Sequence, residues 1–293
     1  MWNRVFLLAS GFLFGWSLVG YWTVPRAQMS TQALRLGIAV AIGGAVIVLL
    51  GLESVQAAAA GVVVFAISAV IAYAGNARQV NRLEEPTPMA RPGPGGIDAP
   101  RWGVVLASCL EPPTYDGPDY WAWRLRRREE RGEDVPHWFT RPRAYARIRS
   151  AYRSLAEAEP AGAPPRDALC RVGEALGAAL GGDHRVETAR LVASPALARV
   201  LTDIARDGIT RVLVQPLAMP RDTVDAIRAA VTHSRVREVG VRVTVAEPLP
   251  VPAWDGADAR LDAWLAGRPP DLPASVDADT VARLQSHVVA LEQ

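Results

Sequence analysis

The sequence has only two cysteines and four histidines, and it has no lysine among its 32 basic side chains. Cys109 and Cys170 are far apart, and neither belongs to a C-x-x-C pair or to a Cys/His group with zinc spacing. A disulfide framework is therefore not expected. The formal net charge of +2 is close to zero, so composition gives no case for a nucleic-acid partner.

Charges are almost absent from three early apolar segments, 5–22, 33–52 and 57–74, in which Arg35 is the only charged residue. Each segment is near the ~20 residues that a helix needs to cross about 30 Å of hydrocarbon. A cleaved signal peptide is the alternative for the first segment, but no A-x-A-like site follows it. The sequence therefore predicts three transmembrane helices, with membrane lipid as a partner.

The placement of arginine predicts how these helices are oriented. Five arginines flank the first connection or follow the third segment: Arg26, Arg35, Arg78, Arg82 and Arg91. Three crossings bring these two regions to the same side, and the other side has only Arg4. The positive-inside rule then predicts a cytoplasmic soluble domain and an N-terminus outside a bacterial inner membrane.

Residues 84–100 are dense in Pro and Gly and are typical of a linker. After them, short apolar runs alternate with helical patterns. The predicted strands are 103–109, 185–192, 210–215 and 239–246. The predicted helices are 140–157, 166–180, 195–206 (capped by Ser194), 221–232, 257–266 and 277–291. This alternation predicts an α/β domain over 102–267 with a four-stranded parallel sheet covered by helices on both faces. The last helix is amphipathic, and it either packs on this domain or docks on a partner.

Three stretches in this domain have a recognisable order: GVVLASCLEPPTYDG, then DYWAWRLRRREERGEDVPHWFTRPRAYARIRSAYRSL, then VETARLVASPALARVLTDIARDGITRVLVQPLAMP. Together they resemble one half of a ferrochelatase, or a small cobalt/sirohydrochlorin chelatase. In this resemblance Arg190 and Pro195 match a family arginine and proline, Pro216–Pro220 matches a strand-end motif, and the aromatic middle stretch matches a lip over the porphyrin. The implied ligands are a tetrapyrrole (heme or porphyrin) and a divalent metal such as iron.

The sequence departs from the family where the metal chemistry lies. Ferrochelatases carry a catalytic His and a partner acid in a second half, which has no counterpart in 102–267. Small chelatases use one His after the first strand and another after a later strand. In this chain Ser108-Cys109-Leu110 and Met219-Pro220-Arg221 occupy those places.

Candidate site residues follow from two considerations: ligands of parallel α/β sheets bind beyond the carboxyl ends of the strands, and a chelatase needs a base, a metal ligand and an aromatic wall. The candidate bases are Glu111, His137 and Glu247. The candidate tetrapyrrole contacts are Tyr115, Trp121, Trp123, Arg124, Arg190, Met219 and Arg221. The candidate metal ligand is Cys109.

Each candidate also has a structural interpretation. His137 and Cys109 are compatible with packing roles, the tryptophans with a core or a protein interface, and the arginines of 124–131 with a solvated helix face or anionic head groups.

Two hypotheses for the function of the protein follow. The favoured one is a catalytically degenerate accessory subunit of a membrane complex, or a tetrapyrrole binder. The alternative is an active, membrane-tethered chelatase, as a homodimer that restores the two-half cleft. An open pocket lined by Glu111, His137, Cys109 and Glu247 would favour the enzyme, and a filled one the accessory protein.

Overall fold

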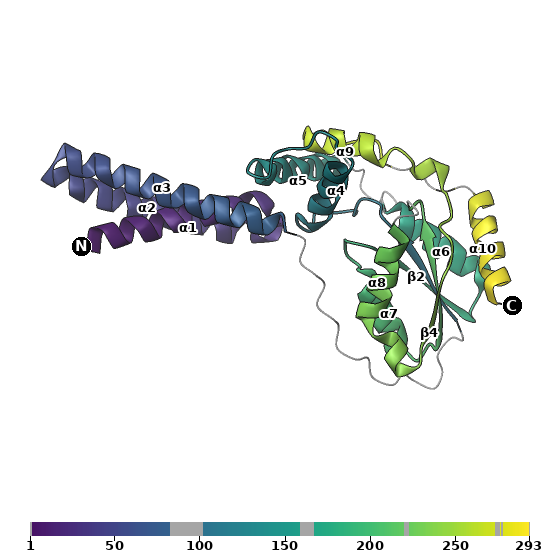
Figure 1. Cartoon of the computed structure of the whole chain (residues 1–293). Coiled ribbons are helices and arrows are strands. Elements are labelled where there is room, and N and C mark those ends of the chain that lie inside the picture. The colour runs from purple at the N-terminus through teal and green to yellow at the C-terminus, as the bar shows by residue number, and fades with distance from the viewer. Residues whose placement is uncertain are drawn as a thin grey trace. The chain divides into compact units, whose positions relative to one another are not determined.

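The computed structural model describes residues 2–82, 102–158, 167–219, 223–272, 276 and 278–292 (Figure 1). The predicted linker therefore lies outside the described residues. The chain forms two compact units. The membrane unit comprises Met1–Leu83, Tyr115–Glu157 and Ala263–Pro269. The α/β unit comprises Glu84–Thr114, Ala158–Asp262 and Pro270–Gln293.

Three long helices form most of the membrane unit: α1 (Trp2–Thr23), α2 (Met29–Glu53) and α3 (Val55–Val80). All three are long and apolar enough to cross a membrane, in agreement with the three predicted segments. A short 3-10 helix, η1 (Arg26–Gln28), precedes α2. Only Ser54 separates α2 from α3, and its hydroxyl accepts a hydrogen bond from the Ala57 N–H at 3.0 Å. This cap allows the chain to reverse direction within one residue.

Close packing of α1 against α3 depends on two glycines of α1. A Cβ atom at Gly11 would overlap the Ser68 hydroxyl, and one at Gly15 would overlap the Ala69 carbonyl oxygen. Small residues allow helix backbones to approach closely in an apolar surrounding, where apolar burial drives little association. The buried amide of Asn76 donates to the Trp16 carbonyl at 2.8 Å, so α1 and α3 are also joined by a polar contact.

Two further helices, α4 (Asp119–Glu130) and α5 (Arg141–Glu157), belong to the membrane unit. Arg149 of α5 donates to the carbonyl oxygens of Tyr21 and Val24, each at 2.8 Å. The Tyr115 hydroxyl donates to the Thr23 carbonyl at 2.8 Å. These bonds satisfy carbonyls that the last turn of α1 leaves without helical partners. This segment was predicted to belong to the α/β domain (102–267), whereas its contacts group it with the three long helices.

The α/β unit contains a four-stranded sheet with the order β2-β1-β3-β4, and every neighbouring pair is parallel. The strands are β1 (Trp102–Ser108), β2 (His184–Arg190), β3 (Arg211–Leu217) and β4 (Arg242–Val245). The other elements are α6 (Ala168–Leu180), α7 (Leu197–Arg206), α8 (Val224–Ser234), η3 (Val236–Val239), η4 (Pro252–Trp254) and α10 (Ala278–Glu292). Helix α9 (Ala257–Leu265) is divided between the units, because its residues from Ala263 onward belong to the membrane unit. The predicted parallel sheet is confirmed.

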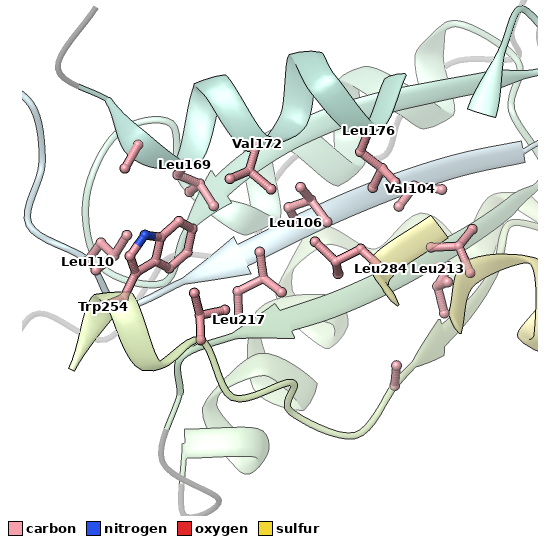
Figure 2. Close-up of a cluster of buried hydrophobic side chains, with 14 residues drawn as sticks. Val104, Leu106, Leu110, Leu169, Val172, Leu176, Leu213, Leu217, Trp254 and Leu284 are labelled. Carbon is pink, nitrogen blue, oxygen red and sulfur yellow. The ribbon is translucent and has the colours of Figure 1, made fainter. Parts of the chain in front are cut away.

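Helices cover both faces of this sheet (Figure 1). On one face, α6 and α10 lie over a core that includes Leu106 of β1 and Leu213 of β3 (Figure 2). Leu284 and Val288 of α10 are fully buried in that core. The C-terminal helix therefore packs on its own domain, which was one of its two predicted roles. On the other face, α7 approaches β1 at Gly103, where an added Cβ atom would lie 3.2 Å from Ile204.

The boundaries of α7 and β4 differ from the predicted ones for local reasons. The helix predicted from Pro195 begins at Leu197, and Ser194 does not cap it. The Ser194–Pro195 peptide is cis, and the Pro195 carbonyl accepts the Arg190 N–H at 2.8 Å. Ala196 also forms an isolated parallel bridge with Arg190. Because of this backbone pairing, Pro195 and Ala196 lie beside the end of β2 instead of starting the helix. The predicted strand 239–246 is shorter at both ends, because η3 occupies its first residue and Gly240, with a φ of 88°, turns the chain.

Candidate functional site

The carboxyl ends of β1, β2 and β3 lie side by side at one edge of the sheet. The strand register aligns Ser108, the last residue of β1, with Arg190 of β2 and Leu217 of β3. In the order β2-β1-β3-β4, the connection after β1 leads to one side of the sheet and the connection after β3 to the other. This divergence defines the topological switch point at which α/β proteins bind ligands. A ligand site is therefore expected at this edge.

The chain fills this edge with its own residues. Beyond β4 the chain continues in the same direction, and Leu249 forms a parallel bridge with Leu217 at the end of β3, with two backbone hydrogen bonds, to Ala218 N at 3.0 Å and Pro216 O at 2.9 Å. Farther on, Trp254 lies beside Leu110 and Leu217 at the carboxyl ends of the strands (Figure 2). Trp254 is only 2% exposed. The space that a ligand would use at the switch point is therefore occupied by the covering segment, residues 249–260.

The predicted base Glu111 is held in an ion pair at this edge. Its carboxylate accepts from Arg260 Nε at 2.7 Å and from Arg260 Nη2 at 3.3 Å. The side chains of Glu111 and Arg260 are 5% and 10% exposed. Arg260 also donates to the Asp255 carbonyl at 2.7 Å. Such a two-pronged contact uses the planar fork of the guanidinium, so Glu111 fastens the covering segment to the residues that follow β1.

Arg190, the arginine matched to the chelatases, forms a second buried ion pair. Its Nη2 donates to Asp167 Oδ2 at 2.6 Å, and its Nη1 donates to the Ser194 carbonyl at 3.1 Å. Asp167 is the N-cap of α6 and accepts the backbone N–H groups of Leu169 and Cys170. Burial raises the pKa of Asp167, but the hydrogen bond and the charge of Arg190 together lower it by more. The pKa of Asp167 therefore lies below its ordinary value. Arg190 therefore ties the end of β2 to the start of α6.

The other predicted residues of the edge do not form a metal centre. Cys109 and Met219 are buried, at 8% and 7% exposure, whereas the Glu247 side chain is exposed. Arg221 lies outside the described residues. Across the described ranges, no group of three or more His, Cys, Asp or Glu side chains is placed to hold a metal ion.

The predicted aromatic lip is a packed cluster inside the membrane unit. Trp264 stacks on Tyr152 with ring centroids 4.2 Å apart, and Trp121 contacts both of these rings. Trp121 and Trp264 are at most 1% exposed. Tyr115, 8% exposed, packs its ring against Tyr152, and burial raises the pKa of its phenol. A tetrapyrrole needs a free aromatic face, so these rings do not fit one.

The remaining lip residues lie around this cluster. Trp123 and Arg124 of α4 are half-buried, and the Trp123 ring is 6.1 Å from that of Tyr120. His137 is exposed in the connection between α4 and α5, and its Nδ1 accepts the Phe139 N–H at 3.4 Å. His137 belongs to the membrane unit, whereas Glu111 belongs to the α/β unit. The enzyme hypothesis requires one pocket lined by Glu111, His137, Cys109 and Glu247. These four residues do not belong to one unit, so neither unit by itself forms that pocket.

The arginines of 124–131 are largely neutralised by neighbouring glutamates rather than gathered for propionates. Arg126 and Arg127 pair with Glu130, at 3.3 and 3.9 Å. Arg128 and Arg131 pair with Glu133, at 2.8 and 2.5 Å. These pairs are partly exposed, so each contributes little to stability. Their arrangement is that of a solvated helix face, which was one of the predicted alternatives.

Four residues that organise these regions were not among the predictions: Asp167, Trp254, Arg260 and Trp264. Asp167 directly precedes a helical pattern, and this N-cap signal could have identified it. Trp254 and Trp264 lie in a Pro- and Asp-rich segment whose only unusual feature is two tryptophans. No local pattern links Arg260 to Glu111, because the pair spans 149 residues.

No protein-family model, no curated protein and no solved structure matches this chain.

Proposed function

We propose that this chain is a membrane-anchored accessory protein, in which a chelatase-like α/β domain has lost its metal chemistry and serves as a structural subunit of a larger membrane complex. The covering segment carries this proposal. It fills the switch point with Trp254 and Leu249, and Arg260 pairs with the acid that would otherwise be the nearest candidate base. Metal insertion requires an accessible base and metal ligands in one open cleft.

The aromatic lip supports the same proposal. A tetrapyrrole carrier needs exposed ring faces, whereas Trp121, Tyr152 and Trp264 cover one another. Four arginines of 126–131 beside the lip are paired with Glu130 or Glu133, and Arg190 is paired with Asp167. An accessory role needs neither feature. It needs an anchor and a rigid fold, and both are supplied by the three apolar helices and the parallel sheet.

The proposed orientation has the α/β unit in the bacterial cytoplasm and the N-terminus outside. Three crossings bring the end of α1 and the end of α3 to one side. Arg26, Arg35, Arg78 and Arg82 lie at that side, and only Arg4 lies at the other. A reporter that is active only in the cytoplasm, fused after Gln293, is expected to be active. Activity of a periplasmic reporter at the same position would contradict this orientation.

A metal-insertion assay distinguishes the proposal from the alternative of an active chelatase. The full chain in lipid nanodiscs is mixed with a porphyrin and a divalent metal, and metal insertion is followed by absorption. The expected rate equals that of empty nanodiscs, and Glu111→Gln leaves it unchanged. A rate above the empty-disc control that Glu111→Gln abolishes would establish the chelatase and reject the accessory role.

A further inference from the structure

Residues 135–140, which we call the interfacial loop, end the connection between α4 and α5 and are fixed to the last turns of α3. The Tyr73 hydroxyl donates to the Phe139 carbonyl at 2.7 Å. The Asn81 amide donates to the Trp138 carbonyl at 3.2 Å and accepts the Tyr145 hydroxyl at 2.7 Å. Tyr73, two turns before the end of α3, and Asn81, directly after it, therefore both hold the interfacial loop. All of these residues lie in the membrane unit.

The length of α3 places this loop at the membrane surface. Tyr73 comes 18 residues after Val55, the first residue of α3. At 1.5 Å per residue, this distance is about 27 Å, close to the thickness of about 30 Å of the hydrocarbon core. A helix that begins at one surface therefore brings Tyr73 to the other. In such a crossing, Phe139, whose carbonyl accepts the Tyr73 hydroxyl, would lie at the boundary between acyl chains and head groups.

The loop presents aromatic side chains suited to this boundary. Phe139 is 38% exposed, and its ring is 4.6 Å from that of Tyr73. Trp138 packs on a small cluster of Val19, Tyr73 and Ala77. Aromatic residues are enriched where head groups meet the acyl chains. A partly exposed Phe next to a Trp is thus unfavourable in water and favourable in this layer.

Positive charge accompanies the aromatic rings. The Arg78 guanidinium lies 4.7 Å from the centre of the Trp138 ring. Arg78 and Arg82 are exposed, and within the described part of the chain no carboxylate pairs with either. In contrast, the arginines of α4 are matched by glutamates. Two exposed cations at a membrane surface complement the phosphate of an anionic phospholipid.

We propose that the interfacial loop enters the head-group layer and that Arg78 and Arg82 beside it bind the phosphate of an anionic phospholipid. Trp138 and Phe139 lie at the acyl boundary, and the lipid becomes a bridge between α3 and the α4–α5 connection. This site depends on the helices crossing a membrane. It does not depend on the absence of catalysis, so it can hold whether or not the accessory role does.

The position of the loop is tested by photocrosslinking in nanodiscs. The full chain carries the photoreactive residue p-benzoylphenylalanine in place of Phe139, a substitution that keeps an aromatic ring. Val289 of α10, which is 42% exposed, is replaced in the same way as a matched control. Lipid adducts identified by mass spectrometry are expected at position 139 and not at position 289. Adducts at 139 with protein alone, or equal lipid adducts at both positions, would overturn the proposal.

The charge requirement is tested by lipid competition. Native mass spectrometry measures retention of phosphatidylglycerol against phosphatidylcholine on the detergent-solubilised full chain. Each arginine near an anionic surface strengthens binding about fivefold, so Arg78→Gln with Arg82→Gln is expected to lower the preference about 25-fold. The control double variant, Arg126→Gln with Arg127→Gln, removes the same charge from paired arginines and is expected to have no effect. Equal losses in both double variants, no preference in the wild type, or displacement of the lipid by millimolar inorganic phosphate would each reject a phospholipid site.

Discussion

The aromatic lip and the carboxyl edge of the sheet were expected to form one ligand site, but each is closed by a different kind of contact in a different unit. The lip is closed by rings that stack on one another, with Trp264 against Tyr152. The edge is closed by the covering segment, which is held by the ion pair of its Arg260 with Glu111. Residue types that a chelatase would use for a cofactor are used in both places to bury the chain itself.

This comparison shows that side-chain chemistry alone does not distinguish a binding surface from a core. Trp, Tyr and Arg bury large areas and form directional contacts, so they serve equally well in ligand sites and at internal junctions. The distinction lies in whether a face remains open. In the lip and at the edge, the residues that cover the face come from far along the chain, from 249–265.

Replacing Trp264 with Ala tests the lip and is expected to have the largest effect. The side chain is fully buried, and loss of a buried Trp costs about 3–5 kcal/mol. Hydrogen exchange measured by mass spectrometry should rise in α4 and α5, while β1 and β3 keep their protection. Trp123→Ala, at a half-buried position, is the control and should change exchange less. Uniform loss of protection in both units would show that they unfold together.

Replacing Arg260 with Ala tests the edge. The change leaves Glu111 buried without a partner, and breaking a buried ion pair in this way costs about 3–5 kcal/mol. Chemical denaturation of the full chain should show a destabilised α/β unit, with exchange rising in β1 and β3 rather than in α5. The double variant Glu111→Gln with Arg260→Met removes both charges and should recover most of the stability. A single variant as stable as the wild type would mean that the pair does not hold the covering segment.

Replacing Gly15 with Ala tests the close packing of α1 on α3, which depends on a small residue rather than on stacked rings or an ion pair. The new Cβ atom would overlap the Ala69 carbonyl oxygen of α3, and overpacking of this kind costs about 1–3 kcal/mol. Unfolding of the full chain in increasing SDS should begin at a lower detergent fraction. Gly37→Ala in α2, where nothing lies within 4 Å of the added atom, is the matched control and should behave like the wild type.

Acid should weaken the link between β2 and α6 through Asp167. Its folded pKa lies below its ordinary value. The stability it contributes is therefore present above the unfolded pKa and is lost as pH falls through the folded pKa. Between about pH 5 and pH 2, wild-type stability should fall more steeply than that of Asp167→Asn. Parallel pH profiles of the two proteins would show that the Arg190 pair does not govern this dependence.

Replacing Arg126 with Ala should have the smallest effect. Arg126 and Glu130 are both more than half exposed, and exposed pairs at this helix spacing contribute about 0.3–0.5 kcal/mol. The melting temperature should be nearly unchanged, in contrast to Arg260→Ala. A loss as large as that of the buried pair would show that the α4 face is covered, for example by a partner subunit.

Much of the fold was predictable because its signals are local. Three long apolar segments with a single charged residue predicted α1–α3. Alternating strand and helix patterns predicted the four-stranded sheet, since their periodicity follows from backbone geometry. The start of α7 was not predictable, because it depends on a backbone hydrogen bond between Arg190 and Pro195.

The division into units and the closed site were not predictable for a different reason. Tyr115 and Arg149 join the membrane unit through bonds to Thr23 and Tyr21, which are more than 90 residues away. The closing of the edge depends on Arg260 reaching Glu111 across 149 residues. Such contacts are tertiary, and a single sequence contains no local pattern for them.

The most direct measurement is to purify the chain from its native membrane without overexpression, and to record its absorption spectrum and the stoichiometry of co-purifying subunits. A structural subunit should be free of pigment and should be recovered in a fixed ratio to other membrane proteins. A stoichiometric tetrapyrrole band on the chain alone, or on a homodimer of it, would contradict the accessory role and show that a ligand site is open in the native protein.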